Sequence, residues 1–214
     1  MKTILLIGLG RFGRHAARKL RELGHQVMAI DREEQCVNAV LPYVTGALIG
    51  DSTNQEFLQT LGVETFDVCV VAIGDDFQSS LETTALLREC GAKFIVSRAS
   101  RDVQEKLLLH NGADEVVYPE KQLAEWAAIC YSSDYILDYI AVGEDFSLYE
   151  IAVPERWVGR SVAQLNIRRR YQINVVALKQ GGRILSDINP DAPLTGDLTL
   201  LVIGRDKDVQ MILR

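Results

Sequence analysis

The stretch Thr3-Ile4-Leu5-Leu6-Ile7-Gly8-Leu9-Gly10-Arg11-Phe12-Gly13 decides the fold of this chain. A strand predicted over residues 3–7 leads into a Gly-x-Gly-x-x-Gly motif, and a helical pattern opens at Arg11. In that context Gly8 permits a tight turn, Gly10 lets a pyrophosphate approach the backbone, and Gly13 allows the helix to pack on the strand. The helix N-terminus offers N–H groups and a positive dipole end to phosphates. The alternative is a glycine turn that binds nothing.

The alternation of strand and helix continues through the first 120 residues. Further strands are predicted at 26–30, 44–49, 67–73, 94–97 and 115–118, and helices at 11–23, 33–41, 57–61, 77–90 and 103–111. The run at 68–73 is almost entirely apolar, which is typical of a strand buried on both faces of a parallel sheet. Thr53 and Glu56 fit a capping box for the helix at 57–61. The pattern predicts an α/β fold with a doubly wound parallel sheet.

The rest of the chain has a different pattern. Pro119-Glu120 can start a helix, and we predict one continuous helix over 121–140. Beyond it, strands at 147–153, 173–178 and 198–203 and helices at 161–171 and 206–213 indicate a small α+β domain. We therefore expect a Rossmann-like domain at 1–120, a helical crossover arm at 121–140 and a second domain at 141–214. A core that small is marginally stable alone, so pairing with a second copy is expected.

Composition excludes several classes of protein. The 214 residues carry a net charge of −6, and residues 1–134 hold 13 Lys and Arg against 19 Asp and Glu. That balance argues against a broad nucleic-acid surface. No apolar run reaches the ~18–20 residues that cross a bilayer. The apolar stretch at the N-terminus is too short to be the core of a signal peptide. A cytosolic protein that does not insert into the membrane is expected. The four cysteines form no C-x-x-C pair, and the histidines have no zinc-ligand spacing.

Asp31 follows the second predicted strand, 18 residues after Gly13. A carboxylate there accepts hydrogen bonds from both ribose hydroxyls and repels a 2′-phosphate, which favours NAD or another nucleotide with an unphosphorylated ribose over NADP. The neighbouring Arg32 could instead accommodate that phosphate. Asp31 could also serve as the N-cap of the next helix.

Other candidates follow the third, fourth and fifth strands, at the edge where this architecture binds ligands. Asp51 and Ser52 lie where a base ring is expected, and Ala72-Ile73-Gly74 would let a ligand pass close to the backbone. Arg98 could reach a phosphate. Turn or N-cap duty remains open for Asp51, and a surface ion pair remains open for Arg98.

The sequence holds no recognisable catalytic apparatus. No tyrosine is followed by lysine four residues on, as a short-chain dehydrogenase requires, and neither G-x-S-x-G nor a P-loop lysine motif occurs. The histidines in the first third, His15 and His25, lie within or just after the first helix. An NAD-dependent oxidoreductase with an unrecognised active site is the alternative function. A redox-sensing transcription regulator is disfavoured because no helix-turn-helix segment is apparent.

Several motifs resemble one family along nearly the whole chain. They are Ile7-Gly8-Leu9-Gly10-Arg11-Phe12-Gly13, Gly24-His25-Gln26-Val27 leading to Asp31, Gly50-Asp51-Ser52-Thr53, Val70-Val71-Ala72-Ile73-Gly74, Asn111-Gly112-Ala113-Asp114 with Tyr118-Pro119-Glu120-Lys121, and Leu165-Asn166-Ile167-Arg168. The chain is similar to cytosolic RCK or Trk/Ktr nucleotide-binding subunits of bacterial potassium transporters. With one N-lobe and one C-lobe, it resembles the shorter Ktr type.

The resemblance implies a non-enzymatic function. Dimers would assemble into an octameric ring under a membrane K⁺-translocating subunit, at the inner face of the cell membrane. ATP against ADP, or NADH against NAD⁺, would stabilise different ring shapes. Arg11 matches a residue that reaches nucleotide phosphates, including those of a neighbouring subunit. Glu120 matches a carboxylate that helps hold Mg²⁺ or another cation near the γ-phosphate.

A second ligand site is expected in the C-terminal domain. Arg168-Arg169-Arg170 precedes Tyr171 and Asn174, which places three cations near two hydrogen-bonding groups. Guanidinium groups bind phosphate with matched geometry. C-lobes of similar regulators bind cyclic di-AMP, so Arg168, Arg169 and Asn174 are candidate ligands. The alternative is a solvated face neutralised by Asp138, Glu150 and Asp191.

Overall fold

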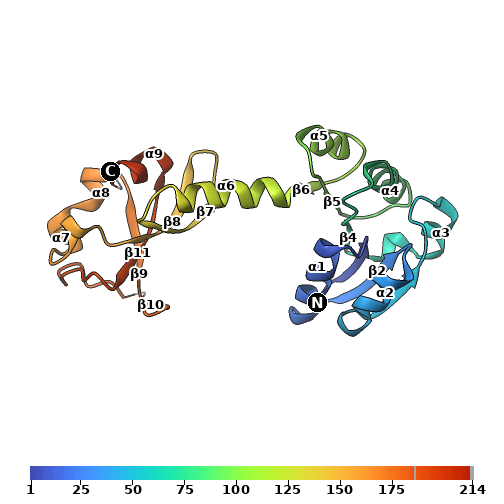
Figure 1. Ribbon diagram of the computed structural model, residues 1–214, viewed down its shortest axis with the longest axis horizontal. Coiled ribbons are helices and arrows are strands. Elements are labelled where there is room, and N and C mark those ends of the chain that lie inside the picture. The colour runs from blue at the N-terminus through green and yellow to red at the C-terminus, as the bar shows by residue number, and fades with distance from the viewer. Residues whose placement is uncertain (186, 213–214) are drawn as a thin grey trace. The chain divides into compact units, whose positions relative to one another are not determined.

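A six-stranded sheet with helices beside it forms the first unit of the computed structural model, Met1–Lys121 (Figure 1). The structure describes residues 1–185 and 187–212. The strand order is β3-β2-β1-β4-β5-β6, and every pair is parallel. The strands are β1 (Thr3–Ile7), β2 (Gln26–Asp31), β3 (Gly46–Ile49), β4 (Val68–Val71), β5 (Ile95–Arg98) and β6 (Glu115–Val117). The predicted doubly wound parallel sheet is confirmed.

Helices cover both faces of this sheet. Leu5 packs in one apolar cluster with Leu58 and Leu87, whereas Leu6 packs in another with Ala17 and Val37. The helices of the unit are α1 (Arg11–Glu22), α2 (Glu34–Val40), α3 (Gln55–Thr60), α4 (Phe77–Glu89) and α5 (Asp102–His110), with 3-10 turns η1 (Leu41–Tyr43) and η2 (Val63–Thr65). Since the strand order reverses between β1 and β4, the carboxyl ends of these two strands flank the crevice in which such sheets bind ligands.

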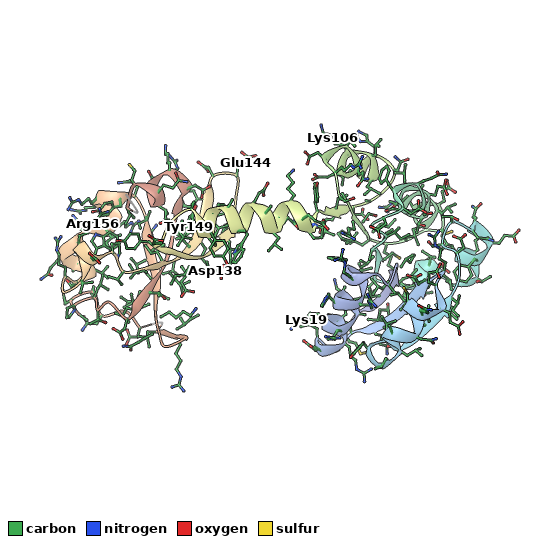
Figure 2. All side chains as sticks on the ribbon, viewed as in Figure 1. Lys19, Lys106, Asp138, Glu144, Tyr149 and Arg156 are labelled. Atoms are coloured by element: carbon green, nitrogen blue, oxygen red, sulfur yellow. The ribbon has the colours of Figure 1, made fainter. Side chains whose placement is uncertain are left out.

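The second unit, Gln122–Arg214, contains a five-stranded antiparallel sheet of order β10-β9-β11-β8-β7. Its core includes Trp157 and Tyr149, of which Tyr149 is labelled in Figure 2. The Tyr149 hydroxyl donates to Asp206 Oδ1 at 2.9 Å. The elements are β7 (Ile136–Ala141), β8 (Phe146–Ala152), η3 (Glu155–Trp157), α7 (Val162–Leu165), α8 (Ile167–Tyr171), β9 (Asn174–Gln180), β10 (Arg183–Leu185), β11 (Leu198–Arg205) and α9 (Asp206–Ile212). The predicted small α+β domain is confirmed.

The continuous helix predicted over 121–140 is wrong. Helix α6 (Pro119–Tyr131) starts in the first unit, continues into the second and ends before a turn. Ser132 donates its hydroxyl to the Ile129 carbonyl, and Ser133 accepts from Tyr135 N, so serine side chains compete with helical hydrogen bonds. The following residues pair with β8 as the edge strand β7. None of the helices within the described residues has the length and apolar character to cross a membrane.

Two smaller expectations also change. The helix predicted over 161–171 is split into α7 and α8 by Asn166, whose φ of 49° is left-handed. The strand β10 was not predicted, and it pairs with β9 after the Gly181-Gly182 turn. The final residue of the helix expected at 206–213 lies outside the described residues.

The expected capping box at Thr53 does not form. Asn54 is the N-cap of α3, and its side chain accepts from Phe57 N at 3.1 Å. Thr53 instead donates its hydroxyl to Asp51 Oδ1 at 2.7 Å. The Thr53 hydroxyl, which the capping box required, is therefore already hydrogen-bonded to the Asp51 carboxylate.

Replacing Asn54 with alanine should lower the free energy of unfolding by about 1 kcal/mol, since the Phe57 N–H loses its acceptor. Glu56→Ala should change it by less than about 0.5 kcal/mol, because no reciprocal capping bond exists to lose. Urea denaturation of both variants measures this. A larger loss in Glu56→Ala than in Asn54→Ala would contradict the assignment.

Candidate functional site

A cavity of about 600 Å³ opens at the carboxyl edge of the parallel sheet, where β1 and β4 end. All its lining residues belong to the first unit. Of the residues singled out in the sequence, the structure brings together around this cavity Gly8, Gly10, Arg11, Phe12, Asp31, Arg32, Asp51, Ser52, Ala72, Ile73, Gly74, Arg98 and Glu120. The lining also includes Ile7, Glu33, Cys36, Gly50, Asp75, Asp76, Ser79 and Pro119. Gly13 is buried behind it.

The physical reason for glycine is not the same at all three motif positions. Gly8 has a φ of +90°, and a Cβ on Gly13 would lie 2.0 Å from the Gly8 carbonyl oxygen. Both positions therefore require glycine for the protein's own packing. Gly10 has an ordinary φ of −65°, and a Cβ there would meet no protein atom within 4 Å. Glycine is a favoured N-cap residue, and the open space beside Gly10 also leaves room for a ligand to approach the backbone.

Gly10 is also the N-cap of α1, and no side chain caps that helix. The first turn of a helix has N–H groups without intrahelical acceptors and carries partial positive charge. Arg11, exposed at the first position of α1, adds a full positive charge beside the same opening. The arrangement fits an anionic group placed against the backbone of Gly10.

Asp31 ties the glycine loop to the end of β2. Its Oδ2 accepts from Leu9 N at 2.6 Å and its Oδ1 from Glu33 N at 2.9 Å. The N-cap of α2 is Glu33, so the alternative interpretation of Asp31 as that cap is not supported. The carboxylate lines the cavity and retains lone pairs for ribose hydroxyls.

Polar side chains line the cavity next to Asp31. Arg32 Nη1 lies 3.6 Å from Asp76 Oδ2, and Asp76 caps α4 by accepting from Ser79 N. The Ser79 hydroxyl and N–H hold the pKa of Asp76 below its ordinary value. Hydrogen bonds from Thr53 lower the pKa of Asp51 in the same way. Ser52 is buried, and its hydroxyl pairs with Thr83 at 2.8 Å. N-cap duty for Asp51 is not observed; it forms a local turn with Thr53.

Arg98 and Glu120 meet at another part of the wall. Arg98 Nη2 donates to Glu120 Oε1 at 2.5 Å, and Arg98 Cζ lies 5.8 Å from the centre of the Phe12 ring. A hydrogen bond from its own backbone N–H, together with Arg98, lowers the pKa of Glu120. The described residues hold no group of three or more His, Cys, Asp or Glu placed to bind a metal.

Sequence reasoning missed Cys36 and Ser79 as lining residues, because both lie on helices behind the strand ends. Burial, followed by the Asp31 carboxylate, raises the pKa of the Cys36 thiol. A thiol with a raised pKa forms less thiolate and is therefore a poor nucleophile. The only signal in the sequence was a position directly after a predicted strand. That signal does not identify lining residues that lie within the following helix.

The second predicted cluster lies in the other unit. Arg168, Arg169 and Arg170 are exposed on the short helix α8, and Asn174 begins β9. The three arginines form no ion pair with any of the described residues. Two of the three expected neutralising carboxylates are otherwise engaged, since Glu150 pairs with Lys179 and Asp138 accepts from Trp126 Nε1; Asp191 forms no ion pair with these arginines among the described residues.

Substituting Gly10 by alanine should change the free energy of unfolding by less than about 1 kcal/mol, the scale of an N-cap replacement, but weaken binding of an adenine dinucleotide at least about tenfold, since the new methyl group occupies space open to a ligand. Gly13→Ala is the matched comparison and should lower the free energy of unfolding by about 1–3 kcal/mol. Thermal unfolding and titration calorimetry separate the two effects. A Gly10→Ala protein that binds like the parent would show that the cavity has been assigned wrongly.

Comparison with known proteins matches both units of the chain. The TrkA-N domain family matches residues 4–119, and the TrkA-C domain family matches residues 147–214. The Ktr system potassium uptake protein C of Bacillus subtilis (strain 168) is 38% identical over 208 residues, covering 97% of this chain and 94% of that protein. The Ktr system potassium uptake protein A of the same organism is 33% identical over 209 residues, covering 98% and 94%.

A solved structure agrees with these sequence matches. The GsuK channel bound to NAD aligns with a TM-score of 0.70 at 17% identity, over 97% of this chain and 38% of that chain. At that identity the likeness shows the fold. Because the two domain families match in order along one chain, and relatives at 38% and 33% identity cover almost all of it, this chain belongs to the RCK, or Trk/Ktr, family of potassium-uptake proteins.

Proposed function

We propose that this chain is a non-enzymatic, cytosolic regulatory subunit that binds an adenine nucleotide and thereby gates a membrane potassium transporter. The observation that carries the proposal is the open backbone of Gly10, beside which a Cβ would meet no protein atom within 4 Å, at the start of α1 where no side chain caps the helix. The names of its relatives as potassium uptake proteins give the transport context.

The cavity supports a nucleotide with an unphosphorylated ribose. Its phosphates would lie against Gly10 and Arg11, and its ribose hydroxyls would donate to Asp31. Arg32, the residue that could have accepted a 2′-phosphate, is directed to Asp76. NAD, NADH, ATP and ADP all satisfy these contacts. The solved GsuK channel is described as bound to NAD.

The lining supports binding over catalysis. Within the described residues the cavity wall contains no histidine, tyrosine or lysine. Its one thiol, Cys36, has a raised pKa. An NAD-dependent oxidoreductase remains the alternative, and steady consumption of NADH with a carbonyl compound would support it.

Gating would use the difference between nucleotides. Arg11 and Glu120 would contact the γ-phosphate and its cation, with Glu120 supplying one carboxylate oxygen. ADP lacks that phosphate, so the two nucleotides would bind two protein shapes with different affinity.

Assembly would turn these shapes into ring states beside the membrane partner. We propose that residues 1–120 form the nucleotide-binding lobe, that α6 and the segment up to 140 form the dimerisation arm, and that dimers build an octameric ring at the inner membrane face. The support is apolar surface left open: Leu123 of α6 and Ile140 of β7 are 64% and 57% exposed. Apolar surface of this kind is typical of contacts between subunits.

Saturating ATP with Mg²⁺ and saturating ADP should give different small-angle scattering profiles, because only ATP can engage Arg11 and Glu120 together. Glu120→Gln should shrink that difference, since the amide is a weak cation ligand. Superimposable profiles of the unmodified protein with the two nucleotides would refute the gating mechanism.

We also propose that the α8 arginines bind cyclic di-AMP. The support is their exposure, their lack of ion pairs within the described residues, and Asn174 at the start of the next strand. Paired second units would present this cluster twice to a two-fold symmetric dianion.

Cyclic di-AMP should bind the full-length protein, and Arg169→Ala should weaken that binding by about 1.5–3 kcal/mol, the range for hydrogen bonds to charged groups. Arg183→Ala, an exposed arginine on β10, is the control and should bind as the parent does. Calorimetry measures all three proteins. Absence of binding by the unmodified protein would leave these arginines as a solvated face.

A further inference from the structure

The ion pair between Arg98 and Glu120 joins two side chains that differ in solvent exposure. Arg98 extends from the last position of β5 and its side chain is only 19% exposed. Glu120 is the second residue of α6 and its side chain is 58% exposed. The cation is confined within the cavity wall, whereas the carboxylate is free to move toward solvent.

The position of the Arg98 guanidinium is set by the fold. A Cβ on Gly74 would lie 2.1 Å from Nη1, so the guanidinium rests directly against the Gly74 backbone. Phe12, in the first turn of α1, lies beside it. The guanidinium is therefore held close to the N-terminus of α1, where the proposed function places phosphate.

Glu120 uses only half of the available hydrogen-bonding edge. Nε and Nη2 of an arginine point from the same edge and together match two oxygens of a phosphate or carboxylate. Glu120 accepts from Nη2, while the buried Nε has no partner among the described residues. A buried donor left unpaired is unfavourable, so an anion that reaches both donors gains over Glu120.

We propose that a phosphate-bearing ligand and Glu120 compete for the same edge of Arg98, so that ligand binding releases Glu120. This inference rests on the proposed nucleotide site and adds how nucleotide binding there could be transmitted to helix α6. Glu120 belongs to the first turn of α6, and α6 continues into the second unit from Gln122. Without ligand, the ion pair holds that first turn to β5, beside the Lys121–Asp102 pair; with ligand, the contact to β5 is lost.

Competition predicts that Glu120→Gln strengthens ADP binding, although the substitution removes a residue that lines the cavity. In a chelating buffer without divalent cations, the variant should bind ADP about three- to tenfold more tightly, because the competing charge is gone. Glu115→Gln is the matched control; it removes an exposed charge from β6, outside the cavity lining, and should leave ADP affinity unchanged. Adenosine, which has no phosphate, should bind Glu120→Gln and the parent equally.

Two further measurements close the test. Arg98→Gln should weaken ADP binding, and the double variant should show no gain from Glu120→Gln, since the shared partner is missing. Amide exchange at residues 123–126 should accelerate when ADP binds the parent. Unchanged or weaker ADP binding by Glu120→Gln overturns the competition, and unchanged exchange overturns the release. If the parent binds neither ADP nor adenosine, the nucleotide site itself is refuted and this inference with it.

Discussion

The close approach of Gly13 to the carbonyl oxygen of Gly8 is the constraint on which the binding site of the first unit depends. Because no Cβ fits between them, α1 begins directly against the end of β1. The Asp31 carboxylate then holds the loop from the other side through Leu9 N. With both ends of the loop fixed, the open face of Gly10 and the uncapped N-terminus of α1 are presented to the same cavity.

The cavity holds more carboxylates than guanidinium groups, although its proposed ligand is an anion. Its lining has three arginines and six acidic residues. Two of the arginines, Arg32 and Arg98, are already engaged by Asp76 and Glu120. On the proposed function, phosphate would be attracted by the start of α1, by Arg11 and, once Glu120 is displaced, by Arg98. The acidic groups elsewhere in the lining would accept from hydroxyl donors, so the charge distribution would orient the ligand as well as hold it.

The sequence predicted the parallel sheet and most of the cavity lining because both follow from local patterns. Apolar runs mark buried strands, and polar residues just beyond them lie at one edge of a parallel sheet. Contacts between distant residues were not predictable in this way. The Arg98–Glu120 pair joins residues 22 positions apart. Likewise, Asn54 replaced Thr53 as the cap of α3 because Asp51 engaged the threonine hydroxyl.

Predictions failed most often where a polar residue redirected the backbone. The serines after Tyr131 end α6, and the residues beyond them gain more by pairing with β8 than by extending a helix. Asn166 adopts a left-handed conformation that splits α7 from α8. Of these, the pairing with β8 is a tertiary contact, and it overrides the helical tendency of the local sequence.

Helix α6 has a mechanical property that follows from its length alone. Its 13 residues form a rod about 20 Å long at 1.5 Å per residue. A tilt of about 10° at the end that carries Glu120 would displace the opposite end by about 3 Å, given that rise. A tilt triggered by the proposed release of Glu120 would therefore displace the far end of the helix by more than the length of the hydrogen bond that was lost.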